Sequence, residues 1–273
     1  MNIDETFLEL QKHGEGALIT FITGGDPAPK YTIKLVEALI EGGADILEIG
    51  VPFSDPIADG PTIQAANYRA LNANTTPHAI FDIVKETKKR ADVPIALLTY
   101  YNIPFKMGVK DFLEAASRHG VDGLVIPDLP IEEAEEYRET AEMHGIETIF
   151  LAAPSTSIDR LKDILGFISG FVYLVSVFGV TGTREQISQL TKRTIKRFHP
   201  YTIKSVPLVV GFGISRPNHV SSVIRCGAEG AIVGSAFVRI IEDNLDKPNK
   251  MFKEITVLAR ELKIATLQKA IDA

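Results

Sequence analysis

A glutamate stands in the sequence where an apolar residue would be expected. Glu48 belongs to the short apolar run DILEIG (45–50), and alternation along a strand would put Ile46 and Glu48 on the same face. A carboxyl group that a strand turns away from water has a raised pKa, and one tuned toward neutrality can both donate and accept a proton. Glu48 is therefore a candidate general acid–base, and a buried structural glutamate beside a polar neighbour is the alternative.

A second carboxylate follows in the long segment VPFSDPIADGPTIQ (51–64). An aspartate in a loop usually serves to turn the chain, and Asp55, between Ser54 and Pro56, fits that role. Asp59 lies further along the segment, and a loop beside a strand-end glutamate can act as a lid that carries a second catalytic group. We therefore expect Asp59 to act together with Glu48.

Glycines gather where the last two apolar runs end. GFGIS (211–215) completes one run, and a Gly–Ser pair (234–235) completes the other and opens the helical segment SAFVRII. Glycine lets a ligand approach the backbone closely, and a helix N-terminus offers unpaired N–H groups at the positive end of its dipole. With a serine hydroxyl, these amides would bind a phosphate without lysine or arginine. Tight turns alone are the alternative, but glycines at two adjacent strand ends favour a phosphate site built from Gly211, Gly213, Gly234 and Ser235.

Eight short apolar runs alternate with segments of helical spacing. Each run is too short for a buried helix, and its continuous hydrophobicity is typical of a parallel strand covered by helices. Helical spacing is clear in 31–43, 109–120 and 131–145, and the last two segments end in the capping glycines Gly120 and Gly145. The predicted strands are 17–23, 45–50, 94–100, 122–128, 147–153, 171–177, 207–213 and 230–235.

This alternation predicts an α/β protein with the (β/α)8 TIM barrel fold. An open doubly wound sheet is the alternative, but it would need G-x-G-x-x-G after the first strand, where this chain has TGGDPAP. We expect an extra N-terminal helix at 3–12, a final helix at 248–268, and long loops after strands two (51–64) and six (176–186). Such barrels typically have about 250 residues, so residues 1–273 should form a single domain.

Composition and short motifs restrict the ligands that the protein can bind and indicate the compartment in which it works. The net charge of −6 and the lack of a basic run disfavour nucleic acid. The single cysteine, Cys226, excludes an internal disulfide, and neither a signal peptide nor a membrane-spanning run is evident, so we expect a cytoplasmic protein. We expect no metal, since the histidines form no H-x-H or H-x-x-x-H pair. Lys106 is a weak candidate for Schiff-base chemistry, and a G-x-S-x-G elbow is lacking.

The segment LEIGVPFSDPIADGPTIQ (47–64) resembles the α chain of tryptophan synthase. This match is long and nearly free of gaps and is therefore specific, whereas the glycine turns occur in several phosphate-binding barrels. The resemblance covers essentially the whole chain. It continues through ITGGDP (22–27), PIALLTYYN (94–102), VDGLVIPDLP (121–130), LAAPST (151–156), YLVS with GVTG (173–182), and GFGIS with GAIVGSA (211–236).

The resemblance implies a lyase of tryptophan biosynthesis, which cleaves indole-3-glycerol phosphate into indole and glyceraldehyde 3-phosphate by a retro-aldol reaction. Glu48 would then protonate indole C3 and take the hydroxyl proton from the adjacent glycerol carbon. Asp59 would stabilise the charge that develops at the indole N–H. Thr181 and Gly182 match the loop that closes over the substrate. The further residues that the resemblance assigns to substrate binding are Phe21, Leu98, Tyr100, Leu124, Tyr173 and Phe212, beside the four phosphate-site residues.

The resemblance also implies a protein partner. In this family the α chain docks on a β chain that carries pyridoxal phosphate, in an α2β2 assembly, so we expect no cofactor in this chain. The docking surface would include Asp55, Pro56, Asn102 and Pro104. The residues by themselves leave two other functions open: another phosphate-binding barrel enzyme, such as an isomerase or a prenyl-type synthase, and a chain that only activates a β-type partner.

Overall fold

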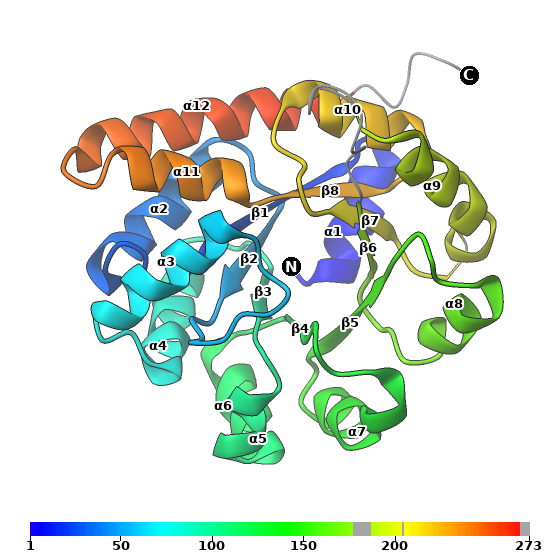
Figure 1. The fold of residues 1–273 in the computed structure, drawn as a ribbon, viewed down its shortest axis with the longest axis horizontal. Helices are drawn as coiled ribbons and strands as arrows, with labels where there is room; N and C mark the ends of the chain where they lie inside the picture. Colours follow the sequence, from blue (N-terminus) through cyan, green and yellow to red (C-terminus); the bar gives the residue numbers. More distant parts are fainter. Residues whose placement is uncertain (177–186, 204, 268–273) are drawn as a thin grey trace.

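The protein is an eight-stranded parallel barrel surrounded by helices (Figure 1). The computed structural model describes residues 1–176, 187–203 and 205–267. The strands follow one another in chain order around the barrel, which closes where Ala17 and Thr20 of the first strand pair with Gly230 and Val233 of the last. The strands are β1 (Ala17–Thr23), β2 (Ile46–Gly50), β3 (Ile95–Leu98), β4 (Gly123–Val125), β5 (Glu147–Ala152), β6 (Val172–Val175), β7 (Leu208–Gly211) and β8 (Gly230–Val233). The predicted TIM barrel is confirmed; β1 has the predicted bounds, and the other seven strands are shorter than their apolar runs.

Helices connect successive strands and cover the outside of the barrel. The expected first and last helices are present, and the expected helix over 131–145 begins as a separate 3-10 turn. Gly120 ends its helix in the left-handed conformation, as expected from its residue type. The helices are α1 (Ile3–Lys12), α2 (Pro29–Glu41), α3 (Pro61–Asn72), α4 (Pro77–Lys88), α5 (Asn102–Met107), α6 (Val109–His119), η1 (Ile131–Glu133), α7 (Glu135–Met143), α8 (Ile158–Leu165), α9 (Gln189–Thr202), α10 (Pro217–Arg225), α11 (Ser235–Asp243) and α12 (Pro248–Thr266).

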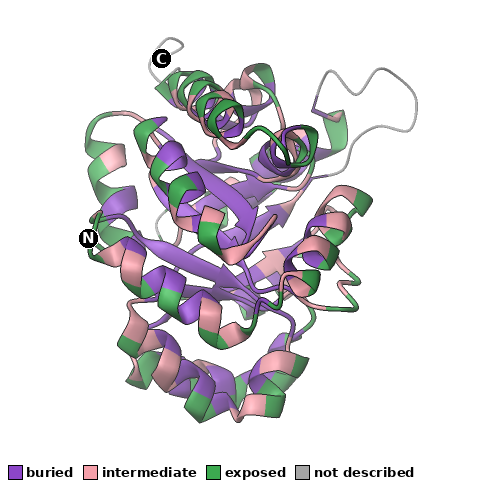
Figure 2. Ribbon diagram, turned by 90° about the vertical axis from the view of Figure 1, so that its left-hand side faces the viewer, coloured by how far each residue is buried: buried purple, intermediate pink, exposed green. Residues whose placement is uncertain are grey.

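Two apolar layers lie on opposite sides of the strands, which are buried along most of their length (Figure 2). Leu47 and Ile49 of β2 pack outward with the helices, whereas Ile46 belongs to the cluster inside the barrel. Because both faces are buried, the strands are hydrophobic at nearly every position. The inner cluster includes Ala17, Ile19, Phe21, Ile46, Ala96, Leu98, Val125, Ile149, Tyr173, Val209 and Ile232.

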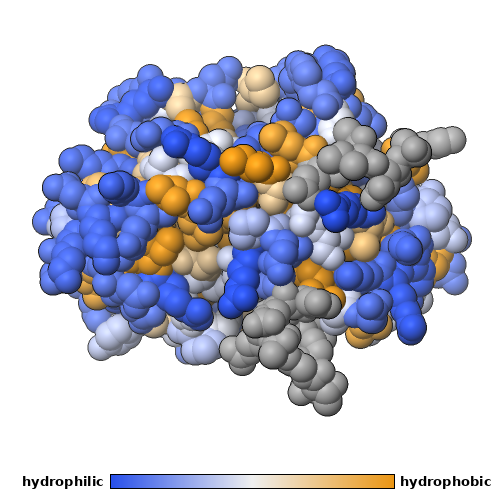
Figure 3. Space-filling view, turned by 90° about the horizontal axis from the view of Figure 1, so that it is seen from above, coloured by the Kyte–Doolittle hydropathy of each residue, from blue (hydrophilic) through white to orange (hydrophobic). Residues whose placement is uncertain are grey.

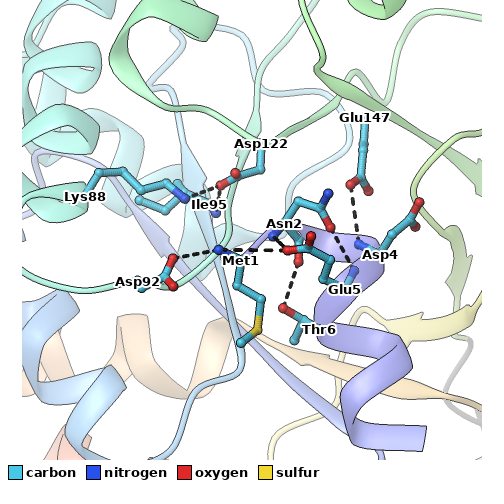
Figure 4. A network of polar contacts seen from close by, with 10 residues as sticks. All are labelled: Met1, Asn2, Asp4, Glu5, Thr6, Lys88, Asp92, Ile95, Asp122 and Glu147. Carbon is cyan, nitrogen blue, oxygen red and sulfur yellow. Dashed lines mark hydrogen bonds and ion pairs between the residues drawn. The ribbon is translucent and has the colours of Figure 1, made fainter.

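Helix α1 lies at the amino-terminal ends of the strands, inside the ring of outer helices in Figure 1. Asn2 and Glu5 form a capping box that satisfies the first backbone N–H groups of this helix. Figure 4 shows the polar contacts around it, in which the Asp4 N–H donates to Glu147 (3.4 Å). Phe7 packs edge-on against Phe171, with ring centroids 5.9 Å apart. The N-terminal helix therefore covers one end of the barrel.

The outer surface is predominantly polar. Seen from above in Figure 3, hydrophilic side chains predominate and apolar ones form small patches. Within the described ranges, no helix has the length and apolarity needed to cross a membrane.

Candidate active site

A cavity of about 340 Å³ opens at the carboxyl ends of the strands. Its walls come from strand ends, from the turns after β7 and β8, and from the first turns of α3 and α11. This is the face of a parallel barrel at which enzymes of this fold bind their substrates. The lining residues are Phe21, Asp59, Gly60, Pro61, Thr62, Ile63, Leu98, Tyr173, Phe212, Gly213, Ile232, Gly234, Ser235 and Arg239.

Glu48 points into the barrel, on the face of β2 that alternation predicts. It pairs in register with Phe21 of the cavity wall and is 1% exposed. Both of its carboxyl oxygens are buried and have no hydrogen-bond partner among the described residues. Burial, with a smaller effect of the Asp59 charge, raises the pKa of Glu48 to about 8. Glu48 is therefore protonated at neutral pH, and none of the residues that the structure describes hydrogen-bonds to its carboxyl group.

Asp59 lies at the rim of the same cavity, at the end of the loop after β2. The Asn67 side-chain amide donates to its carboxylate (3.5 Å), and the Ala58 N–H donates to the Tyr100 hydroxyl (3.0 Å). Burial raises the pKa of Asp59 to about 6, while hydrogen bonding from Tyr100 and Asn67 acts in the opposite direction. The two carboxyl groups thus titrate apart, with Asp59 ionised while Glu48 is still protonated.

Tyr100 and Asn67 hold this loop in place. Asn67 also accepts a hydrogen bond from the Phe53 N–H (3.0 Å), and Phe53 stacks on Tyr100 with ring centroids 5.3 Å apart. Tyr100 is 2% exposed and supports Asp59 from behind, outside the cavity lining. Tyr100 therefore supports the loop that carries Asp59, and its expected contact with the substrate stays a prediction.

The opposite end of the cavity is built from the turns that the sequence assigns to phosphate. Gly234 is the N-cap of α11 and Ser235 its first residue, and both line the cavity, so the helix begins at this end of it. Gly213 and Phe212 both have positive φ, of 72° and 61°, and line the cavity beside them. Gly211 is not part of the lining; a Cβ there would lie 2.2 Å from the Tyr173 ring, so glycine is needed for that close approach.

The apolar wall contains Phe21, Leu98 and Tyr173, as expected from the resemblance. Leu124 does not belong to it. Leu124 packs in the outer cluster, where its carbonyl accepts a hydrogen bond from the Tyr137 hydroxyl (2.9 Å), and its neighbour Val125 faces the barrel interior. Adjacent residues of a strand face opposite sides of the barrel wall, so the position one residue further along β4 is the one that faces inward.

Several lining residues were not expected from the sequence, notably Thr62, Ile63, Ile232 and Arg239. Ile232 could have been found by alternation in the last apolar run. Arg239 could have been found by helical spacing, since it stands four residues after Ser235. Thr181 and Gly182 lie outside the residues that the structure describes. Within the described ranges, no three His, Cys, Asp or Glu side chains form a group that could hold a metal ion.

The residues expected to dock a partner differ in exposure. Asp55 and Asn102 are exposed and Pro56 is half-buried, but Pro104 is buried within its own chain and cannot contribute its side chain to a surface. On the same two segments, Ile57 is 81% exposed and Phe105 68% exposed. These two apolar residues are better suited than Pro104 to contact another protein.

Fold and site together define the class: a TIM barrel with a cavity at the carboxyl ends of its strands, beside which two carboxyl groups, Glu48 and Asp59, lie. A family model for the tryptophan synthase alpha chain matches residues 7–267. The tryptophan synthase alpha chain of Methanoregula boonei is 46% identical to this chain, and the match covers 94% of this chain and 96% of that protein. The tryptophan synthase alpha chain of Methanocaldococcus jannaschii is also 46% identical, and the match covers 93% of this chain and 89% of that protein. The chain belongs to the tryptophan synthase alpha chain family.

Solved structures give the same assignment. A chain of the tryptophan synthase complex from Pyrococcus furiosus superposes with a TM-score of 0.82 at 40% identity, covering 91% of this chain and 98% of that one. Tryptophan synthase subunit alpha from Legionella pneumophila superposes with a TM-score of 0.87 at 32% identity, covering 97% of this chain and 98% of that one.

Proposed function

We propose that this chain cleaves indole-3-glycerol phosphate into indole and glyceraldehyde 3-phosphate, as a carbon–carbon lyase. The observation that carries the proposal is the setting of Glu48: a buried carboxyl group whose oxygens have no partner among the described residues, beside a cavity that Asp59 lines, with a pKa of about 8 for Glu48 and about 6 for Asp59. A retro-aldol cleavage needs such a pair, since it requires an acid that becomes a base and a fixed negative charge opposite the developing cation.

In the proposed mechanism, Glu48 first donates its proton to indole C3. The ring then carries positive charge at its nitrogen, and the Asp59 carboxylate, facing the N–H, stabilises that charge. The Glu48 carboxylate next takes the proton from the hydroxyl on the adjacent glycerol carbon. A carbonyl forms there, the bond to C3 breaks, and its electron pair returns to the ring, which leaves neutral indole and the aldehyde. Glu48 ends the cycle protonated.

The two ends of the cavity suit the two halves of this substrate. Phe21, Leu98 and Tyr173 offer an apolar and aromatic surface for a flat ring, next to Glu48. Gly213, Gly234 and Ser235 offer backbone N–H groups and a hydroxyl for the phosphate. A substrate held at both ends has its scissile bond between them, within the reach of the acidic pair.

We further propose that the chain works with a β chain, which would hold the pyridoxal phosphate, in an α2β2 assembly. The reaction assigned here to Glu48 and Asp59 uses no cofactor. The exposed Ile57 and Phe105, with Asp55 and Asn102, lie on the two segments that would meet the partner. The matched Pyrococcus furiosus chain comes from a tryptophan synthase complex, which supports this expectation.

The test is release of indole from indole-3-glycerol phosphate by the purified chain, with and without a tryptophan synthase β chain. We expect indole in both cases and a marked rise with the partner. A folded protein that releases none under either condition would contradict the substrate assignment. Release that the β chain leaves unchanged would keep the reaction and contradict the coupling.

A further inference from the structure

We propose that Arg239 binds the phosphate of the substrate and supplies the positive charge that the cavity needs to take up an anion. The inference rests on the proposed function and adds to it a residue that determines specificity for a phosphorylated ligand. Of the lining residues that the structure describes, Arg239 is the one with a cationic side chain.

Its place on α11 directs it toward the phosphate end. Ser235 is the first residue of the helix and Arg239 follows four positions later, so the two lie on the same helix face. Side chains of a helix lean toward its N-terminus, which here is the end that meets the cavity. Ser235 and Arg239 both line the cavity, so the Arg239 side chain belongs to the wall that carries the expected phosphate site.

The charge of Arg239 is not used elsewhere. Among the residues that the structure describes, it forms neither an ion pair nor a hydrogen bond. By contrast, Arg69 of α3 is held by Asp26 at 2.7 Å and by Glu242 at 3.3 Å. Glu242, three residues after Arg239, is thus already engaged. A free guanidinium at the mouth of a cavity remains available to a ligand.

The charge balance of the cavity calls for such a group. Asp59 is the other charged lining residue described, and its carboxylate would repel a phosphomonoester, which carries roughly −1.5 to −2 at pH 7. The amides of a helix terminus supply only partial charges, about half an elementary charge in total. A guanidinium offsets the repulsion and offers a planar pair of N–H donors that suits phosphate oxygens.

Loss of the Arg239 contact should weaken substrate binding without slowing the chemical step. The phosphate does not change in the reaction, so its contacts bind the ground state and the transition state alike, and their loss raises KM and leaves kcat nearly constant. For one charge-assisted contact at a partly exposed site, we expect KM to rise roughly five- to thirtyfold in Arg239→Gln. Arg239→Lys should recover part of this effect, because it restores the charge without the planar fork.

The experiment measures KM and kcat for indole-3-glycerol phosphate, inhibition by glycerol 3-phosphate, and calorimetric binding of glycerol 3-phosphate, at low and high salt. The variants are R239Q, R239K and, as a control with the same change of net charge, R260Q. Arg260 is 60% exposed on α12, where its contact is Glu41 at 3.9 Å. Salt screens exposed charges, so the KM of the wild-type chain should rise with ionic strength more steeply than that of R239Q.

The outcomes separate the two proposals. A higher KM, weaker inhibition by glycerol 3-phosphate and a flatter salt dependence in R239Q, with R260Q unchanged, would support the role of Arg239. Equal KM and equal salt dependence in R239Q and wild type would overturn it while leaving the reaction intact. A wild-type chain that releases no indole but binds glycerol 3-phosphate more tightly than R239Q would overturn the reaction alone.

Discussion

Burial gives Glu48 its chemistry and makes the fold less stable at neutral pH. Its pKa is about 8 in the folded protein, above the ordinary value of 4.5, because the ionised form is desolvated. The folded state therefore holds this proton more tightly than the unfolded chain does. Burial of Glu48 therefore costs no stability below pH 4.5, where the group is protonated in both states. The free energy of unfolding falls as the pH rises from 4.5 toward 8.

Glu48→Gln should therefore abolish cleavage and stabilise the fold. We expect turnover to fall by about 10²–10⁴-fold or more. The free energy of unfolding should rise by about 2–4 kcal/mol at pH 8, and the gain should vanish near pH 4.5. Indole release and urea unfolding at the two pH values measure both effects.

Glu147→Gln is the matched control at the other end of the barrel. Burial raises the pKa of Glu147 to about 8 as well, so this variant should also gain stability at high pH, with turnover preserved. Unchanged turnover in Glu48→Gln would remove the acid–base role from Glu48.

The pH dependence of the reaction should be bell-shaped. Asp59 must be ionised, so kcat/KM should rise through its pKa near 6; Glu48 must be protonated, so kcat/KM should fall through a pKa near 8. Because the two carboxyl groups interact, the apparent pKa values of the two limbs of the profile describe the pair and not either residue alone. The measurement is kcat/KM from pH 5 to 9, and a profile that stays flat over that whole range would contradict the assignment.

At the scale of elements, one buried ion pair holds two walls of the cavity together. Arg69 of α3 donates to both carboxylate oxygens of Asp26, at 2.7 and 2.9 Å, and reaches Glu242 of α11. The Asp26 side chain is fully buried in the connection after β1. The contact therefore links α3, which follows the Asp59 loop, with α11, which begins at the phosphate end.

Arg69→Met should destabilise the fold by about 3–5 kcal/mol, because it leaves the Asp26 charge buried and uncompensated. The double variant Asp26→Asn with Arg69→Met should recover part of that loss, since no charge then remains buried. Urea unfolding measures both. Arg90→Met is the control, since Arg90 is 49% exposed and its ion pairs with Glu37 and Glu86 should contribute less than about 1 kcal/mol. Equal effects of the two single variants would refute the importance of the buried pair.

At the scale of the whole molecule, the helix that covers the barrel and the acidic pair lie at opposite ends of the strands. Helix α1 covers the amino-terminal ends of the strands, where Ile3 is fully buried and Phe7 is 7% exposed. The acidic pair and the phosphate end lie at the carboxyl ends. TIM barrels commonly divide their two faces in this way.

Phe7→Ala should therefore lower the free energy of unfolding by about 3–5 kcal/mol, since it leaves a cavity beside Phe171. Below the unfolding transition, kcat and KM should stay within about twofold of wild type, because the strand ends that hold Glu48 do not move. Thermal or urea unfolding and indole release give the two quantities. A large loss of kcat in the folded variant would show that the two ends are coupled.

Much of this molecule could be predicted from local pattern alone. Buried parallel strands need hydrophobic side chains on both faces, so eight apolar runs separated by helices predict the barrel and its approximate elements. The same rule distinguishes Glu48 from its neighbours. A carboxyl group in such a run is costly to bury, and its presence therefore indicates a functional role. Alternation within β2 then predicts correctly that Glu48 faces inward.

Tertiary structure decided what local pattern could not contain. In β4 every residue is apolar or glycine, so the pattern does not say which face is inward, and Val125, not Leu124, faces the interior. Pro104 is buried and Phe105 exposed because of what packs against α5, which no local rule describes. Arg69 contacts Asp26, 43 residues away in the sequence, and Glu242, 173 residues away. Arg239 reaches the cavity only because the barrel closes and brings the first turn of α11 beside the end of β1.

Sequence thus determined the elements and the buried acid, since both follow from short-range periodicity and the cost of burying charge. The closed barrel determined which side chains share the cavity.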